Sequence, residues 1–160
     1  MKLLLLILSF LALSAFCFKT EKSFILLEAT QQSWIGGIQG SGRGVNYQFK
    51  IVIQTQKRIS LDTIWLNDSK YKLEISKGRI RNYQLPLKNN DTLTLMMREF
   101  FPDESTTKFI NRENEKLLKV EKIKAPIKFD GRALIRFYLG EKKKYFTVKE
   151  IFKKEDLMYQ

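Results

Sequence analysis

The chain has 160 residues, of which 29 are Lys or Arg and 17 are Asp or Glu, so its formal net charge is +12. It contains no His and a single Cys, which excludes a His-based catalytic triad, an imidazole metal site, a Cys-rich zinc site and an internal disulfide. The apolar fraction of 44% is too high for a disordered chain. We therefore expect one folded domain with no cofactor and no bound metal ion.

The first 17 residues have the composition of a secretory signal peptide. Lys2 is their only charged residue, an apolar run follows from Leu3, and small residues precede Cys17. The run is short for a transmembrane helix, which needs about 20 apolar residues, so an uncleaved anchor is the less favoured interpretation. We expect cleavage after Cys17, within a window from residue 14 to residue 18. Residues 18–160 would then form a single β domain, without a transmembrane helix, that is periplasmic or secreted.

Cys17 permits a second interpretation of the same segment, a lipoprotein anchored through that cysteine. The residues Ser14-Ala15-Phe16-Cys17 stand where a lipoprotein motif has Leu-Ala-Gly-Cys, and Ser14 and Phe16 fit that motif poorly. A free exported protein is therefore the favoured prediction, and lipidation of Cys17 is the alternative. Cleavage after Cys17 would leave a domain that must be stable without disulfides.

The hydrophobic pattern of the remaining chain has a period of two, which is typical of strands with one face on a core. The clearest alternation runs through residues 47–53, 71–75, 93–97 and 133–139, and weaker strand candidates are 24–35, 59–66, 79–85 and 145–152. Turn residues separate these segments at 67–69, 77–78, 88–91, 129–131 and 140–141. We expect an all-β antiparallel sandwich, immunoglobulin-like or jelly-roll-like, with about seven to nine strands. A β-barrel is the alternative.

The segment 111–125 does not follow this pattern. It is rich in Glu, Lys and Leu, which are good helix formers, but its apolar residues form no helical stripe. A helix and a charged hairpin that ends at Pro126 therefore both remain open.

Five of the eight glycines lie within residues 36–44. The spacing fails both phosphate-binding motifs, because Arg43-Gly44 stands where a P-loop needs Lys and a hydroxyl residue, and G-x-G-x-x-G is not matched. A flexible loop or bulged connection between two strands is the favoured interpretation, since Gly readily adopts a positive φ. The alternative is an anion-binding loop, in which backbone N–H groups and a guanidinium hold the ligand. Its residues would be Gly40, Gly42, Arg43 and Gly44.

The basic excess is mostly Lys and is largest toward the C-terminus. Lys-rich segments usually protect strand edges from pairing between molecules, and this is the favoured interpretation. The alternative is a basic patch formed by Lys142, Lys143 and Lys144 that contacts a polyanionic component of the cell envelope. Nucleic acid is not an expected partner, because no recognition motif is present and the protein is expected to be exported.

Aromatic residues and carboxylates offer two further interpretations. The aromatic residues could form a sugar-stacking platform, although in strands they more often belong to the core; they are Trp34, Tyr47, Trp65, Tyr83 and Phe100-Phe101. A two-carboxylate hydrolase needs a pair held a few ångströms apart, and no spacing selects such a pair. The available carboxylates are Asp62, Asp68, Glu74, Asp91, Glu99, Asp103 and Glu104. We therefore expect no enzyme activity.

Several of these residues together form a pattern that resembles short exported β proteins of Bacteroidetes type. The pattern is Trp34-x-Gly36-Gly37-x-x-Gly40-Ser41-Gly42-x-Gly44-x-x-Tyr47-x-Phe49, then Asp62 and Trp65, then Gly131-x-Ala133-Leu134-Ile135 and Lys144-Tyr145-Phe146. The resemblance implies a signal peptide, a β domain and an envelope or secreted location, and it supplies no active site. It also implies O-glycosylation of Asp-[Ser/Thr]-apolar triplets, which would modify Thr63 and Thr92.

These observations favour an exported binding or interaction module, whose partner is a polyanionic envelope component or an envelope protein. Two alternatives remain open. One is a subunit of a surface assembly that makes contact through an exposed strand edge. The other is a small hydrolase that acts on an envelope polymer through Asp or Glu residues.

Overall fold

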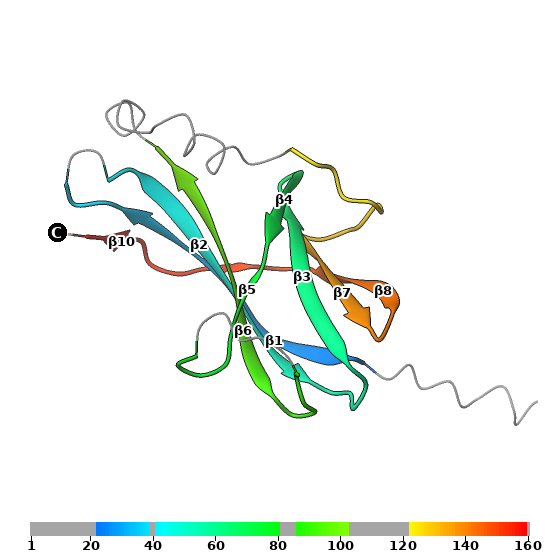
Figure 1. The fold of residues 1–160 in the computed structure, drawn as a ribbon. Helices are drawn as coiled ribbons and strands as arrows, with labels where there is room; N and C mark the ends of the chain where they lie inside the picture. Colours follow the sequence, from blue (N-terminus) through cyan, green and yellow to red (C-terminus); the bar gives the residue numbers. More distant parts are fainter. Residues whose placement is uncertain (1–21, 39–40, 81–85, 103–121, 160) are drawn as a thin grey trace, which may run out of the picture.

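The computed structural model describes residues 22–38, 41–80, 86–102 and 122–159, which form ten strands in two sheets and no helix (Figure 1). Accordingly, no membrane-spanning helix is found in this part of the chain. The sheets face one another, and among the described strands they do not close into a barrel. The expected all-β sandwich is therefore confirmed.

The larger sheet has six strands, in the order β10-β1-β2-β6-β5, and β9 also pairs with β1. Its members are β1 (Phe24–Ile35), β2 (Arg43–Ile53), β5 (Glu74–Ser76), β6 (Thr92–Phe101), β9 (Phe152–Lys153) and β10 (Leu157–Met158). Neighbours are antiparallel, except that β9 and β10 run parallel to β1. The sequence did not predict these parallel pairs. They form because the chain, after leaving the smaller sheet, returns along the edge of β1 in the direction of β1 (Figure 1).

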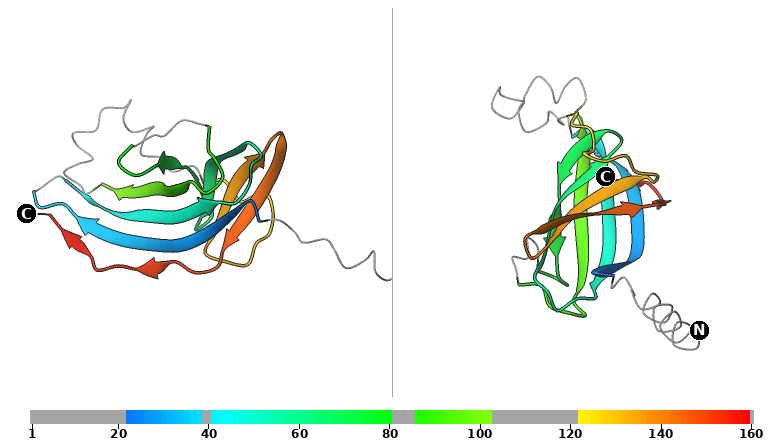
Figure 2. Two further views of the ribbon diagram at one scale, coloured as in Figure 1. Left: turned by 90° about the horizontal axis from the view of Figure 1, so that it is seen from below. Right: turned by 90° about the vertical axis from the view of Figure 1, so that its right-hand side faces the viewer.

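The smaller sheet has four antiparallel strands in the order β4-β3-β7-β8. They are β3 (Ile59–Leu66), β4 (Ser69–Lys72), β7 (Ala133–Leu139) and β8 (Lys142–Val148). Asn67 and Asp68 have positive φ in the two-residue turn between β3 and β4, and Gly140 has positive φ between β7 and β8. These residue types tolerate that conformation, so both predicted turns are confirmed. In the right-hand view of Figure 2, β7 and β8 run across the strands of the larger sheet.

The predicted strand 71–75 is two short strands in different sheets. β4 pairs with β3 in the smaller sheet, and β5 pairs with β6 in the larger sheet. Leu73 lies at the corner between them, is buried, and donates its N–H to the carbonyl of Asp62 at 3.0 Å. The alternation of side chains continues across the corner, so a period of two could not reveal the change of pairing partner.

The remaining strand predictions agree with the structure except, in some cases, at the ends of the strands. Strands 24–35 and 59–66 have the predicted bounds, whereas β8 starts at Lys142 and ends at Val148 instead of covering 145–152. The strand predicted at 79–85 is wrong at its start, because Lys77 and Ile80 close a turn around Gly78. Residues 81–85 lie outside the described part. Of the segment 111–125, only residues 122–125 are described, and they have no regular structure.

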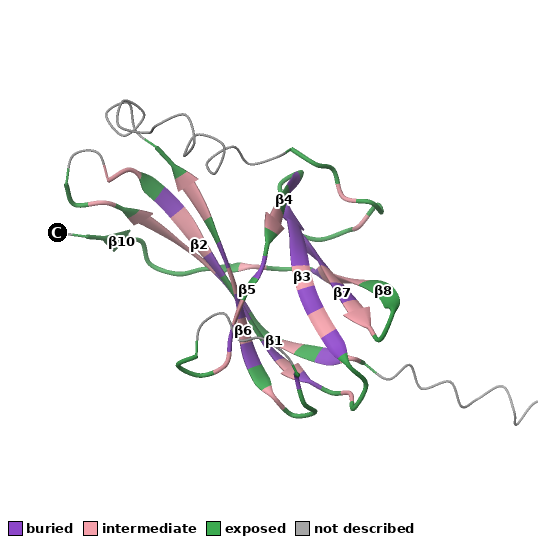
Figure 3. Ribbon diagram, in the orientation of Figure 1, coloured by how far each residue is buried: buried purple, intermediate pink, exposed green. Residues whose placement is uncertain are grey.

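The core lies between the facing surfaces of the two sheets (Figure 3), and buried positions alternate most clearly along β2 and β6 of the larger sheet. Its completely buried side chains are Phe49, Ile51, Ile53, Leu93 and Leu95 from the larger sheet and Ile59, Ile64, Ile135 and Val148 from the smaller one. Burial of each such side chain contributes about 1.5–3 kcal/mol. The inward faces predicted for 47–53, 93–97 and 133–139 are therefore confirmed.

The larger sheet extends beyond the smaller sheet at the end that carries the β1–β2 loop and β10 (Figures 1 and 2). Ile35 and Phe101 lie on the inner face of this projecting end and are about half exposed. The outer face of the same end carries Trp34, Gly44 and Phe100, which occupy one row across β1, β2 and β6.

Candidate functional site

An open groove of about 660 Å³ lies between an edge strand of each sheet. Residues 22–29, which include the N-terminal half of β1, form one wall, and residues 144–147 of β8 form the other. Phe24 packs against Phe137 and Phe146, with ring centroids 5.2 and 4.9 Å apart. These rings give the groove an apolar floor that is continuous with the core.

The groove is open because, in the described structure, no strand pairs with β8 or with residues 24–29 on the side that faces the groove. β9 and β10 cover only the C-terminal half of β1, where they pair at Thr30–Gln31 and Trp34–Ile35. The carbonyls of Gln31 and Ile35 accept hydrogen bonds from the N–H groups of Lys154 and Tyr159. The preceding residues 24–29 pair with β2 alone, through a register shift between Leu26 and Glu28. This stretch of β1 is therefore an edge that can accept another strand.

Apolar side chains and lysines surround the opening. Ile25 and Leu27 are 42% and 55% exposed, and Phe152 is 63% exposed. Lys22, Lys144 and Lys149 also line the groove, together with Glu28 and Glu150. Glu28 forms an ion pair with Lys154 at 3.2 Å, which reduces its influence on a ligand. Lys149 likewise forms an ion pair with Asp130 at 2.7 Å. Lys22 and Lys144 against Glu150 then leave the apolar rim with a small basic excess.

The three lysines of the predicted basic patch lie at the start of β8 and point to two different faces of that strand. Lys142 lies opposite Leu139 and Lys144 opposite Phe137, so these two lysines share the inner face of β8 with core residues. Lys143 lies opposite Tyr138 on the outer face. The three exposed lysines therefore do not share one face of the strand, because side chains alternate along it, and contact with a polyanion stays a prediction. Inward-pointing lysines at an edge strand instead match the protective role favoured above.

The glycine-rich segment connects β1 to β2, as the favoured interpretation predicts. The N–H of Gly36 donates to the carbonyl of Gly42 at 2.9 Å, and Gly42 has a φ of 67°. Gly44 lies in β2, where a Cβ atom would be 2.3 Å from the carbonyl oxygen of Glu99. Arg43 is exposed at the start of β2, and Gly40 lies outside the described residues. Anion binding by this segment stays a prediction.

The predicted modification sites differ in accessibility. Thr63 is buried in β3, and its hydroxyl accepts a hydrogen bond from Nη2 of Arg136 at 2.7 Å. Thr92 is exposed at the start of β6. Of these two threonines, Thr92 is therefore the one that is accessible to an O-linked glycan in the folded chain. Cys17 lies outside the described residues, so its lipidation stays a prediction.

Two of the candidate carboxylates, Asp62 and Asp91, are held by separate partners in different elements. Asp62 receives a two-pronged hydrogen bond from Arg136, with Nε 3.0 Å from Oδ1, and this contact raises the pKa of the guanidinium. Asp91 forms an ion pair with Lys77 at 2.7 Å, which lowers the pKa of the carboxyl. No group of three or more Asp, Glu or Cys in the described chain could hold a metal ion. Asp103 and Glu104 are outside that part. This arrangement does not favour a two-carboxylate hydrolase.

Glu99 forms a cluster with two tyrosines on the inner face, which spacing along the chain could not predict. Tyr47 donates to Oε2 of Glu99 at 3.3 Å, and Tyr71 of β4 donates to Oε1. Burial, reinforced by the carboxylate, raises the pKa of both hydroxyls above the usual value of 10.0. The tyrosines therefore stay neutral donors that hold the edge of the two sheets together.

No family model, curated protein or solved structure matches this chain. The resemblance to exported Bacteroidetes proteins therefore remains an expectation, and function has to be argued from the groove itself. One signal in the sequence pointed to the groove. Residues 24–27 are four consecutive apolar residues, so they place apolar side chains on both faces of the strand. This is unusual for a strand that has one face in water.

Proposed function

We propose that the protein is an exported binding module that holds an extended segment of a partner protein in the groove between β1 and β8. The observation that carries the proposal is the uncovered edge of residues 24–29 beside an apolar groove of about 660 Å³. Strand addition to such an edge supplies main-chain hydrogen bonds, while pockets for alternate side chains supply specificity.

The chemistry of the rim favours a partner segment in which apolar and acidic residues alternate. One set of side chains would face the apolar floor at Phe24 and Phe146. Lys22 and Lys144 line the same groove, and their ammonium groups would attract acidic side chains of the segment. The uncovered edge has six residues, and at about 3.3 Å per residue it spans about 20 Å. A partner segment of about six residues would therefore fill it.

A second copy of the same chain is a poor occupant of this groove. The chain carries a formal charge of +12, so two copies repel one another. The inward-pointing Lys142 and Lys144 add a local barrier to pairing through β8. An acidic segment of an envelope protein would meet neither the repulsion between two basic chains nor the barrier that these lysines create.

Binding of synthetic peptides tests this function. The probes are a fluorescent peptide of alternating Val and Glu and a matched peptide of alternating Val and Lys, followed by anisotropy. We expect the acidic peptide to bind more tightly, and Leu27→Glu to weaken its binding about tenfold or more. Ile80→Glu, at an exposed isoleucine outside the groove, is the control and should bind normally. Equal binding of the two peptides, or normal binding by Leu27→Glu, would contradict the proposal.

A further inference from the structure

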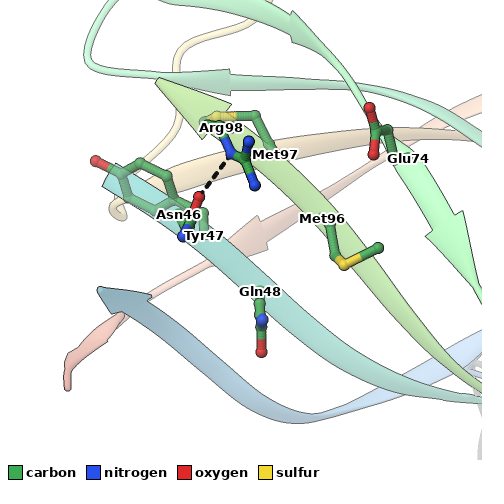
Figure 4. A pocket seen from close by; sticks show the side chains of 7 residues that line it. All are labelled: Asn46, Tyr47, Gln48, Glu74, Met96, Met97 and Arg98. Carbon is green, nitrogen blue, oxygen red and sulfur yellow. Dashed lines mark hydrogen bonds between the residues drawn. The ribbon is translucent and has the colours of Figure 1, made fainter. Parts of the chain in front are cut away.

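A second surface lies on the outer face of the larger sheet and is independent of the groove. It is a cavity of about 360 Å³ (Figure 4). Tyr47 and Met97 of its lining are buried toward the core. The residues that alternate with them lie on the opposite face and give the cavity its chemistry; they are Asn46 and Gln48 of β2, Met96 and Arg98 of β6, and Glu74 of β5. Met96 lies between Glu74 and Gln48 in Figure 4.

An aromatic cluster continues this face toward the projecting end of the sheet. Trp34 of β1 and Phe100 of β6 flank Gly44 of β2, with ring centroids 5.9 Å apart and planes inclined by 23°. A Cβ atom on Gly44 would be 2.7 Å from the indole, so the absence of a side chain lets the indole lie over the strand. Tyr159 meets Trp34 edge-on at 6.3 Å.

Arg98 joins the polar cavity to the aromatic cluster. Its Nε donates to Oδ1 of Asn46 at 2.9 Å (Figure 4). Its guanidinium carbon is 6.0 Å from the centroid of the Trp34 ring. The other guanidinium nitrogens leave several N–H donors for a ligand. Asn46 and Gln48 can both donate and accept through their amides, and Glu74 can only accept.

The charge of the cavity lining differs from that of the whole chain. One cation, Arg98, and one anion, Glu74, balance each other beside two amides, whereas the protein carries +12. A polyanion would be repelled by Glu74 and a polycation by Arg98. A neutral ligand rich in hydroxyl groups satisfies donors and acceptors of both kinds.

We propose that this outer face binds a neutral carbohydrate chain. The rings of Trp34 and Phe100 offer apolar surface to the C–H face of a sugar ring. Arg98, Asn46, Gln48 and Glu74 provide the hydrogen bonds that fix its hydroxyl groups. The proposal stands apart from the peptide groove, because it uses different residues and a ligand of different charge.

A glycan array that carries neutral and acidic oligosaccharides tests the assignment, and calorimetry with each neutral glycan that binds gives its affinity. We expect binding of neutral glycans only, weakened about tenfold by Arg98→Ala and by Gln48→Ala. Gln48 is exposed, so Gln48→Ala should fold normally. It therefore still tests the site if Arg98→Ala fails to fold. Leu27→Glu, in the peptide groove, should bind glycans normally.

Two results would overturn the carbohydrate site. One is binding of no neutral glycan by the folded protein, or of acidic glycans alone. The other is a neutral glycan that binds Gln48→Ala and Arg98→Ala as tightly as the unaltered chain. Because Leu27→Glu affects only the peptide groove, loss of either activity can be assigned to its own site.

Discussion

Of the glycines in the glycine-rich segment, Gly44 is the one for which the structure gives the clearest reason. Any side chain there would meet the carbonyl oxygen of Glu99 on the neighbouring strand and the indole of Trp34. The sequence indicated a need for glycines in this region. It could not show that one of them serves packing across β1, β2 and β6, because that need depends on strand register.

We predict that Gly44→Ala lowers the free energy of unfolding by about 2–3 kcal/mol, because a backbone oxygen 2.3 Å away from the new Cβ cannot move without disturbing the sheet. Chemical denaturation measures the change. Gln48→Ala, on the same strand and the same face, is the control and should stay within about 0.5 kcal/mol of the unaltered chain. Equal stability of the two variants would argue against the packing described for Gly44.

The hydroxyls of Tyr47 and Tyr71 make the free energy of unfolding depend on pH in the alkaline range. Their pKa values are raised in the folded chain, first by burial and then by Glu99. This contribution to stability is complete below the unfolded pKa near 10.0 and is lost as the pH rises above it. We predict that Glu99→Gln lowers the pKa of both tyrosines, as measured by ultraviolet titration of tyrosinate. Glu141→Gln is the control, and an unchanged titration curve in Glu99→Gln would refute the cluster.

At the scale of elements, local patterns predicted what depends on local chemistry. The alternation of Phe49, Ile51 and Ile53 follows from one buried face, and the Asn67-Asp68 turn from tolerance of positive φ. The local patterns did not predict which strands pair with one another. The split between β4 and β5 and the parallel return of β9 and β10 depend on contacts between distant segments, which a period of two does not encode.

The edge strand β8 gives a prediction at the same scale. Lys142 and Lys144 point inward at an edge that lacks a neighbour in the described structure. We predict that the double substitution Lys142→Val and Lys144→Val causes self-association that rises with concentration, because the inner face of β8 then carries no lysine at this edge. Sedimentation velocity measures it. The pair Lys122→Val and Lys124→Val, outside any strand, should remain at the mass of the unaltered protein. A monomeric β8 variant would show that these lysines do not protect the edge.

At the scale of the whole molecule, the sequence predicted the sandwich but could not assemble either of the two proposed binding surfaces. The groove needs β1 and β8 to be brought together from opposite ends of the chain. The outer face needs the register that places Trp34, Gly44 and Phe100 in one row. The aromatics considered for a sugar platform are in fact divided. Tyr47 and Trp65 are buried, Phe101 lies on the inner face, and Tyr83 is outside the described residues.

Export gives a whole-molecule prediction that is independent of either surface. We predict that the intact mass of the native protein matches an unmodified chain that starts at Phe18, because the first 17 residues have the composition of a cleaved signal. Mass spectrometry of fractionated native cells measures it. A chain that starts at Cys17 with added acyl mass would establish the lipoprotein alternative instead.

The most direct measurement of the central claim is hydrogen–deuterium exchange of single amides along β1, with and without the Val–Glu peptide. In the unbound protein, we predict faster exchange at residues 24–29 than at residues 30–35, whose edge β9 and β10 cover. The peptide should slow exchange at residues 24–29 and leave residues 30–35 unchanged. Uniform protection of β1 without peptide, or no slowing when the peptide is present, would contradict strand addition at this edge.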